Sequence, residues 1–387
     1  MNARRALQRT RAPDEVGAEQ RAWEVVRSAY RERPAARVSR LRWRLALVPV
    51  LALVAGALAL SPAGATIARW VKDTLGVPHA TKALFSLPAP GRVLISGPAG
   101  TWIIAADGSA RRLGSWPQAS WSPHGIYVAA ARGDQLAALN SHGAIQWTLA
   151  RRGVADPRWY PPTGYRVAYL SGQSLRVVAG DGSGDHLLAT GVTPVAPAWR
   201  PGHEYELAYE TRAGRLVARN ATTGHALWSA RPGARPSELA WSADGRYLLA
   251  IGSARASLYA ADGRMLANIA PRAAILDASM SPDGRRLAVL LGGSIDRVVV
   301  TKIATLSGPL KPVFSGAGLR ELAWSPNGRW LLVTWPPADQ WVFVRVAGKP
   351  RITAVSRIAE QFGARTSAGR GFPRLDGWCC QRWLVPR

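Results

Sequence analysis

The chain has 387 residues and a formal net charge of +26, from 50 Lys and Arg against 24 Asp and Glu. Its hydrophobic fraction of 48% is normal for a folded protein and excludes global disorder. Two Cys and six scattered His exclude a disulfide scaffold and a Cys-rich zinc protein.

The first 44 residues form a basic arm with twelve Arg against five acidic residues. Apolar residues recur at helical spacing between residues 14 and 33, which predicts an amphipathic helix. Trp23, Val26 and Tyr30 lie on its apolar stripe and are our candidates for docking a partner. The stripe suits either a cytoplasmic protein or the anionic inner leaflet of a membrane, and both alternatives stay open.

Residues 45–68 carry no charge and are long enough to span a bilayer, so we expect a transmembrane helix there. Arginines crowd its N-terminal side, which places residues 1–44 in the cytoplasm and the rest of the chain outside. A cleaved signal peptide is the alternative, because Ala63-Gly64-Ala65 has the small residues of a cleavage site. The 44 residues before the apolar run are too many for that reading. We therefore predict a single-pass protein of a bacterial cell membrane, with a juxtamembrane linker at residues 69–86.

From about residue 87 the chain repeats a unit that reads aromatic, Ser, Pro, polar, Gly, then an apolar run. Seven starts follow one another at intervals of 34 to 44 residues, the first at Leu87. The repeated aromatic position is occupied in the other six by Trp121, Trp159, Trp199, Trp241, Met280 and Trp324.

Each start is followed by the same pattern of predicted strands. An apolar run such as Tyr127–Ala131 or Tyr247–Ile251 comes first, and a second run precedes an Asp-Gly or similar turn. Three or four strands per repeat, seven times, predict an all-β fold, a β-propeller over residues 87–387. Seven blades are expected, with six or eight as alternatives. Large side chains at the repeated position would fill the seams between blades. Residues 359–387 do not fit a blade and are expected to close the ring by completing the first one.

The Trp-Ser-Pro-Asp-Gly pattern resembles the WD40-like repeats of the TolB type, over roughly residues 87–358. The resemblance implies the propeller fold. It implies little about function, because propellers support many unrelated tasks. The predicted membrane anchor departs from the soluble TolB-type proteins, so a role in the same machinery does not follow.

Motifs for chemistry are missing from this sequence. The nearest match to a nucleophile elbow, Gly180 to Gly184, falls in a hairpin turn, and no His pair has metal-ligand spacing. We therefore expect no enzyme, no metal and no cofactor. Arginines occur one or two at a time through the repeats, which we attribute to genome composition with modest surface attraction, and we do not expect nucleic-acid binding.

Cys379 and Cys380 are adjacent, and we expect a structural role for them. They are free, bridged to another chain, or joined to each other. For the whole chain we predict a non-catalytic, extracytoplasmic module that binds a protein or a polymer. The alternative is a signal transducer laid out like an anti-sigma regulator, whose outer propeller senses and whose inner helix holds a cytoplasmic regulator.

Overall fold

The computed structural model describes residues 86–97, 99–161, 163–303, 310, 312–363, 365–366 and 369–380. The predicted helix at residues 14–33, with Trp23, Val26 and Tyr30, and the predicted span at residues 45–68 lie outside the described residues. Within the described part of the chain, no helix has the length and apolar character needed to cross a bilayer.

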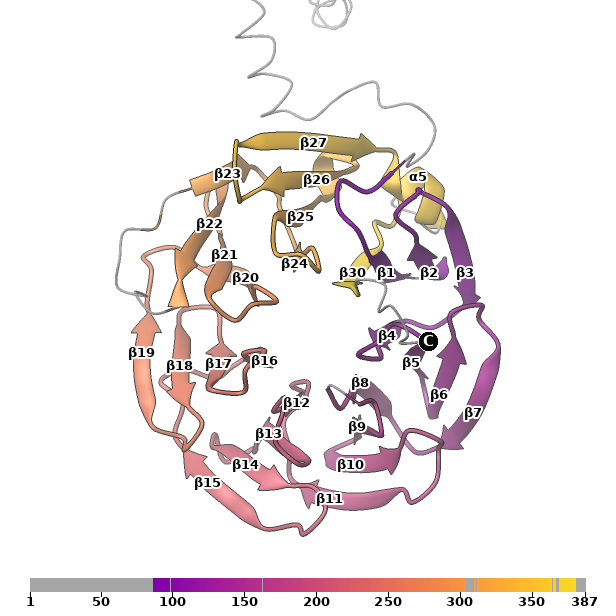
Figure 1. Ribbon diagram of the computed structural model, residues 1–387, viewed down its shortest axis with the longest axis vertical. Helices are drawn as coiled ribbons and strands as arrows, with labels where there is room; N and C mark the ends of the chain where they lie inside the picture. The colour runs from indigo at the N-terminus through magenta and orange to yellow at the C-terminus, as the bar shows by residue number, and fades with distance from the viewer. Residues whose placement is uncertain are drawn as a thin grey trace, which may run out of the picture. The chain divides into compact units, whose positions relative to one another are not determined.

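Seven four-stranded antiparallel sheets follow one another around a central axis (Figure 1). The predicted all-β, seven-bladed propeller is therefore confirmed. In blades two to seven the first strand in the chain lies nearest the axis and the fourth lies at the outer edge (Figure 1).

Blades two to seven use consecutive strands. Blades two to four contain β4 (Gln118–Trp121), β5 (Tyr127–Arg132), β6 (Gln135–Asn140), β7 (Ile145–Ala150), β8 (Val154–Trp159), β9 (Arg166–Ser171), β10 (Ser174–Ala179), β11 (His186–Thr190), β12 (Ala198–Trp199), β13 (Glu206–Glu210), β14 (Leu216–Asn220) and β15 (Ala226–Ala230). Blades five to seven contain β16 (Glu238–Trp241), β17 (Tyr247–Ile251), β18 (Ala256–Ala260), β19 (Met265–Ile269), β20 (Ile275–Met280), β21 (Arg286–Leu291), β22 (Asp296–Lys302), β23 (Pro312–Gly316), β24 (Leu322–Trp324), β25 (Trp330–Trp335), β26 (Gln340–Arg345) and β27 (Arg351–Ser356).

Blade one joins the two ends of the propeller. Its outer three strands are β1 (Arg92–Gly97), β2 (Gly100–Ile104) and β3 (Ala110–Gly114), and its innermost strand is β30 (Arg374–Cys379). β30 pairs antiparallel with β1, from Arg92 opposite Cys379 to Ser96 opposite Arg374. Between β27 and β30 lie the short helix α5 (Ile358–Phe362) and the two-residue strands β28 (Arg365–Thr366) and β29 (Gly369–Arg370).

The middle strands are apolar because both of their faces are covered by neighbouring blades. Every residue of β25 is buried, and so are the four central residues of β5. The outer strands alternate exposed and half-buried residues, as β7 does, because only one face meets another blade. One continuous cluster, for example, packs Leu94 of blade one against Val128 of blade two.

The Ser of the repeat sets the start of each second strand. The buried Ser281 Oγ accepts a hydrogen bond from the backbone N–H of Arg286 (2.9 Å). The backbone N–H of Ser281 in turn donates to the backbone carbonyl of Arg286 (2.8 Å). Its hydroxyl also donates to Asp283, whose carboxylate accepts the N–H of Arg285. Equivalent bonds join Ser122 to Tyr127, Ser242 to Tyr247 and Ser325 to Trp330. The first residue of the second strand is thus held in a constant place against the next blade.

Candidate functional site

The residues of the repeated aromatic position each end the first strand of a blade. Trp159, Trp199 and Trp324 are buried, while Trp121, Trp241 and Met280 are half-buried. The indole of Trp324 donates to the carbonyl of Ser279 in blade six (2.8 Å), and that of Trp199 donates to the carbonyl of Arg158 in blade three (2.9 Å). These two side chains stabilise the seam with the preceding blade.

An arginine covers three of these rings from the preceding blade. The guanidinium of Arg286 lies 4.8 Å from the ring centre of Trp324 and donates to the carbonyl of Gly328 (2.6 Å), in the turn of the next repeat. A positive charge over an indole is attracted by the ring, and the carbonyl fixes its position.

The same contact recurs at two other seams. Arg92 lies 5.0 Å from the ring centre of Trp121 and donates to the carbonyl of Gly125. Arg200 lies 5.3 Å from Trp241 and donates to the carbonyl of Gly245 (2.7 Å). We call Arg92, Arg200 and Arg286 the inter-blade arginines.

The residue that faces the ring of the next blade is usually the first residue of a blade's second strand. Arg92 and Arg286 are the first residues of the second strands β1 and β21. In blade four that position is Glu206, which forms an ion pair with Arg200 (2.6 Å) and so holds it over the next ring. In blade three the position is Arg166, which lies 4.1 Å from the ring centre of Tyr205 in the next blade.

Two blades have tyrosine at this position instead, Tyr127 in blade two and Tyr247 in blade five. Each of the two seams that they face carries a surface groove. Because a tyrosine ring supplies neither the charge nor the donor that reaches the glycine carbonyl, these seams lack the contact that Arg92, Arg200 and Arg286 make at three other seams.

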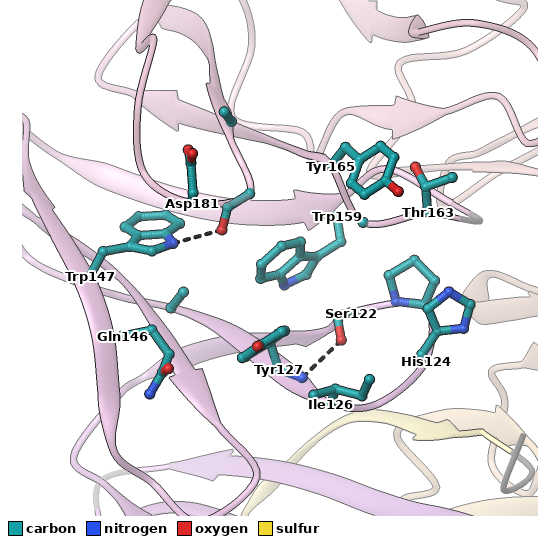
Figure 2. A pocket seen from close by; sticks show the side chains of 15 residues that line it. Ser122, His124, Ile126, Tyr127, Gln146, Trp147, Trp159, Thr163, Tyr165 and Asp181 are labelled. Carbon is teal, nitrogen blue, oxygen red and sulfur yellow. Dashed lines mark hydrogen bonds between the residues drawn. The ribbon is translucent and has the colours of Figure 1, made fainter. Parts of the chain in front are cut away.

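The groove between blades two and three, which we call the aromatic groove, has a volume of about 660 Å³. Tyr127 stacks on Trp159, with ring centres 6.3 Å apart and planes inclined by 23°. Ile126 and Tyr165 also line the groove and are 55% and 67% exposed. Figure 2 shows the rings of Trp147, Trp159 and Tyr165 following one another across the groove.

The outer wall of the aromatic groove is Trp147, on the outer strand β7. Its indole crosses the seam and donates to the carbonyl of Gly180 in blade three (2.8 Å) (Figure 2). Gly182 follows in the turn, with φ of +89°, and a Cβ there would lie 2.8 Å from the indole of Trp147. A glycine is therefore required for the ring to lie against this turn.

The groove between blades five and six has a volume of about 700 Å³ and a different chemistry. Arg246, Arg285 and Lys302 line it beside Tyr247 and Ile303. The corresponding ring of the next blade is absent, because Met280 replaces the tryptophan. This groove is charged where the aromatic groove is apolar.

Polar residues stand three positions before the repeated aromatic residue, and Glu238, Asp277 and Glu321 line a cavity at the inner strands, which we call the central channel. The polar residues at this position are Gln118, Asp156, Glu238, Asp277 and Glu321. Three of them accept a backbone N–H from the next blade: Gln118 from Asp156 (2.7 Å), Asp277 from Leu322 (2.6 Å) and Glu321 from Leu375 (2.9 Å). Their side chains therefore join neighbouring inner strands around the ring.

Burial in the channel makes these carboxyl groups weak acids. Desolvation raises the pKa of Glu321 to about 7 and that of Asp376, on β30, to about 6. Desolvation also raises the pKa values of Glu238 and Asp277, which lie on adjacent blades and repel each other when both are charged. Raised pKa values are typical of active sites, but bonds to backbone N–H groups give Asp277 and Glu321 a structural role.

The remaining chemical candidates also have structural roles. Ser183, the nearest match to a nucleophile motif, donates its hydroxyl to Asp181 within a turn (2.6 Å). Among the described residues, no three His, Cys, Asp or Glu side chains are grouped so that they could hold a metal ion. Cys379 and Cys380, for which the sequence left three states open, form a disulfide with each other beside the turn at Pro123.

Sequence reasoning missed the inter-blade arginines and the aromatic groove. It attributed the scattered arginines to composition, whereas Arg92, Arg200 and Arg286 each have a specific partner in the next blade. A usable signal was present, because aligning the repeats shows arginine or tyrosine shortly after the glycine. The function of that arginine or tyrosine depends on a tryptophan of the next blade, about 40 residues further along the chain, and a single repeat does not show that contact.

No family model matches the sequence, and no curated protein matches it. Solved structures match by fold. Hsv2p of Kluyveromyces lactis is 12% identical over 69% of this chain and 95% of its own, with a TM-score of 0.53. A chain of the mitotic checkpoint complex is 15% identical over 70% of this chain and 95% of its own, also with a TM-score of 0.53. These identities establish a WD40-like seven-bladed propeller fold and nothing narrower, so the TolB-type resemblance stays a prediction.

Proposed function

We propose that this chain is a non-catalytic interaction module that binds a protein partner in the aromatic groove. The observation that carries the proposal is the gathering of exposed apolar side chains at one seam, with Ile126 55% and Tyr165 67% exposed. Exposed apolar surface of this kind marks interaction sites, and aromatic residues are enriched in their centres. The missing inter-blade arginine supports the same proposal, because three other seams are closed by one.

We further propose that the propeller is held at a cell membrane, on the extracytoplasmic side. The uncharged residues 45–68 and the arginines before them support this location. Alkaline extraction of membranes from cells that produce the chain tests the anchor, and protease protection tests the side. Release by alkali, or protection of the propeller inside the cell, would contradict the location and leave the groove proposal standing.

A photocrosslinking amino acid placed at Tyr165 tests the binding proposal in membranes of producing cells. The matched control is Ile295, which is 60% exposed and does not line the aromatic groove. We expect one protein to crosslink at Tyr165 and at Ile126 but not at Ile295. We expect this crosslink to disappear when Tyr127 is replaced by Arg. Equal crosslinking at the control position, or none in the groove, would refute the proposal.

The signal-transducer alternative depends on the apolar stripe of residues 14–33. The same crosslinker at Tyr30 tests it separately. A cytoplasmic regulator captured there would make the arm functional, and lipid alone would make it a membrane-surface helix.

A further inference from the structure

We propose that the aromatic groove binds an extended, proline-containing segment of its partner that carries one Lys or Arg beside the prolines. This inference rests on the proposed function and specifies the ligand of that site. It follows from three properties of the groove, namely its rings, the hydrogen bonds that its buried polar groups make or lack, and its charge.

The rings form a stepped apolar surface. Trp147 belongs to blade two, while Trp159 and Tyr165 belong to blade three, and the three follow one another across the groove (Figure 2). Segments in the polyproline conformation dock in grooves lined by aromatic residues, because their rigid rings fill the spaces between side chains with little loss of entropy.

Two of the polar groups in the groove are already occupied within the protein. The indole N–H of Trp147 donates to Gly180, and the hydroxyl of Ser122 accepts the N–H of Tyr127. A ligand rich in donors, such as a glycan, would find neither of these two groups free. Proline has no N–H, so a proline-containing segment brings few donors that need partners.

The indole N–H of Trp159 has no partner among the residues that the structure describes. The corresponding indoles of Trp199 and Trp324 donate to carbonyls of the preceding blade, whereas those of Trp121, Trp159 and Trp241 are buried without a partner in the described part of the chain, and of these three only Trp159 lines the aromatic groove. The side chain is 7% exposed and lines the groove. A ligand carbonyl that displaces the adjacent Tyr127 ring would accept this hydrogen bond, and the carbonyls of a polyproline segment are free to do so.

The charge of the groove differs from that of the protein. Its described lining residues include the acidic Asp181 but no Lys or Arg, in a chain of net charge +26. Hydrogen bonds from Ser183 lower the pKa of Asp181, so this carboxylate stays ionised at neutral pH. It attracts one cationic side chain locally, while the overall positive charge disfavours a long basic run.

Fluorescence anisotropy with the full chain in detergent tests the proposal. The probe is a labelled ten-residue peptide with three prolines and one arginine, and two companions replace the prolines by alanine or the arginine by glutamate. We expect the alanine peptide to bind at least about tenfold more weakly, as loss of an interface anchor does. We expect the glutamate peptide to bind about threefold more weakly, and this difference to disappear in Asp181→Asn.

Two tyrosine substitutions locate the binding site. Tyr127→Arg supplies the residue that lies over the ring at other seams and should abolish binding. Tyr247→Arg makes the same change at the seam between blades five and six and should leave binding intact. Thermal unfolding of both variants checks that they fold.

Three results would overturn the inference. They are equal binding of the proline and alanine peptides, binding that survives Tyr127→Arg, and a glycan fragment that binds in the groove while the peptides do not. In each case, partner crosslinking at Tyr165 would show that the proposed function stands and only the ligand class is wrong. Absence of crosslinking would overturn both.

Discussion

Replacing Arg286 by Met removes one inter-blade arginine and keeps a side chain of similar length. The guanidinium donates to the carbonyl of Gly328 at 2.6 Å and lies 4.8 Å from the ring centre of Trp324. Its ion pair with Asp283 is long, at 3.9 Å, and the carboxylate is 48% exposed, so that pair contributes little. The change therefore isolates the contact with the next blade.

The expected loss of stability follows from these two contacts. A hydrogen bond from a charged donor contributes roughly 1.5–3 kcal/mol. The ring contact adds about 0.5–1 kcal/mol at a site of this exposure. Met keeps part of the packing of the arginine stem, so we expect a net loss of about 1.5–3 kcal/mol. For a domain of this size, that lowers the midpoint of thermal unfolding by roughly 3–6 °C.

The assay is thermal and urea unfolding of the full chain, followed by tryptophan fluorescence. Arg285→Met is the matched control, because Arg285 is the exposed neighbour and does not lie over Trp324. Equal stability of the two variants, within about 0.5 kcal/mol, would refute our account of the seam.

Three further predictions address the turns, the channel and blade three. Ser242→Ala should cost about 1–3 kcal/mol in urea unfolding, because the buried hydroxyl no longer accepts the N–H of Tyr247; a loss below that range would count against the turn. Since the folded-state pKa of Glu321 is raised from 4.5 to about 7, the folded protein binds more protons in that window, and stability should fall as pH rises from about 5 to 8. Glu321→Gln should make this dependence shallower without removing it, because Asp376 and Glu238 also have raised pKa values, and a rising wild-type curve would contradict the assignment. Asp185→Asn should cost about 1.5–3 kcal/mol, because its carboxylate, 6% exposed, accepts hydrogen bonds from two partly exposed arginines, of which Arg176 is 2.6 Å away; an unchanged urea midpoint would show that the pairs are unimportant.

The repeat was enough to predict the blades because strand and turn signals are local. The predicted strand at residues 247–251 is β17 without any change of bounds, and that at residues 127–131 is one residue shorter than β5. Turn chemistry explains this success, since Ser, Pro, Asp and Gly determine where each second strand begins.

The site was not predictable in the same way because it depends on differences between repeats. Tyr127 and Arg286 occupy the same place in their blades, and neither residue is unusual on its own. Both face a tryptophan of the following blade, Trp159 and Trp324, and only the comparison of the two contacts distinguishes an open seam from a closed one. The polar side chains of the central channel could not be predicted either. Gln118, Asp277 and Glu321 accept hydrogen bonds from backbone N–H groups of the next blade, and the sequence does not identify those partners.

The pairing of β30 with β1 has a consequence for how the protein is made. Ser96 and Arg374, which meet in that pairing, are 278 residues apart in the chain. At a synthesis rate of about 5–20 residues per second, roughly 14–56 s pass between the appearance of the two strands. During that interval the inner edge of β1 has unpaired backbone groups, and blades two to seven can form while the ring stays open. A ribosome that stalls late in the message would therefore release a nearly complete chain with an exposed strand edge, which is the kind of species that chaperones and proteases recognise.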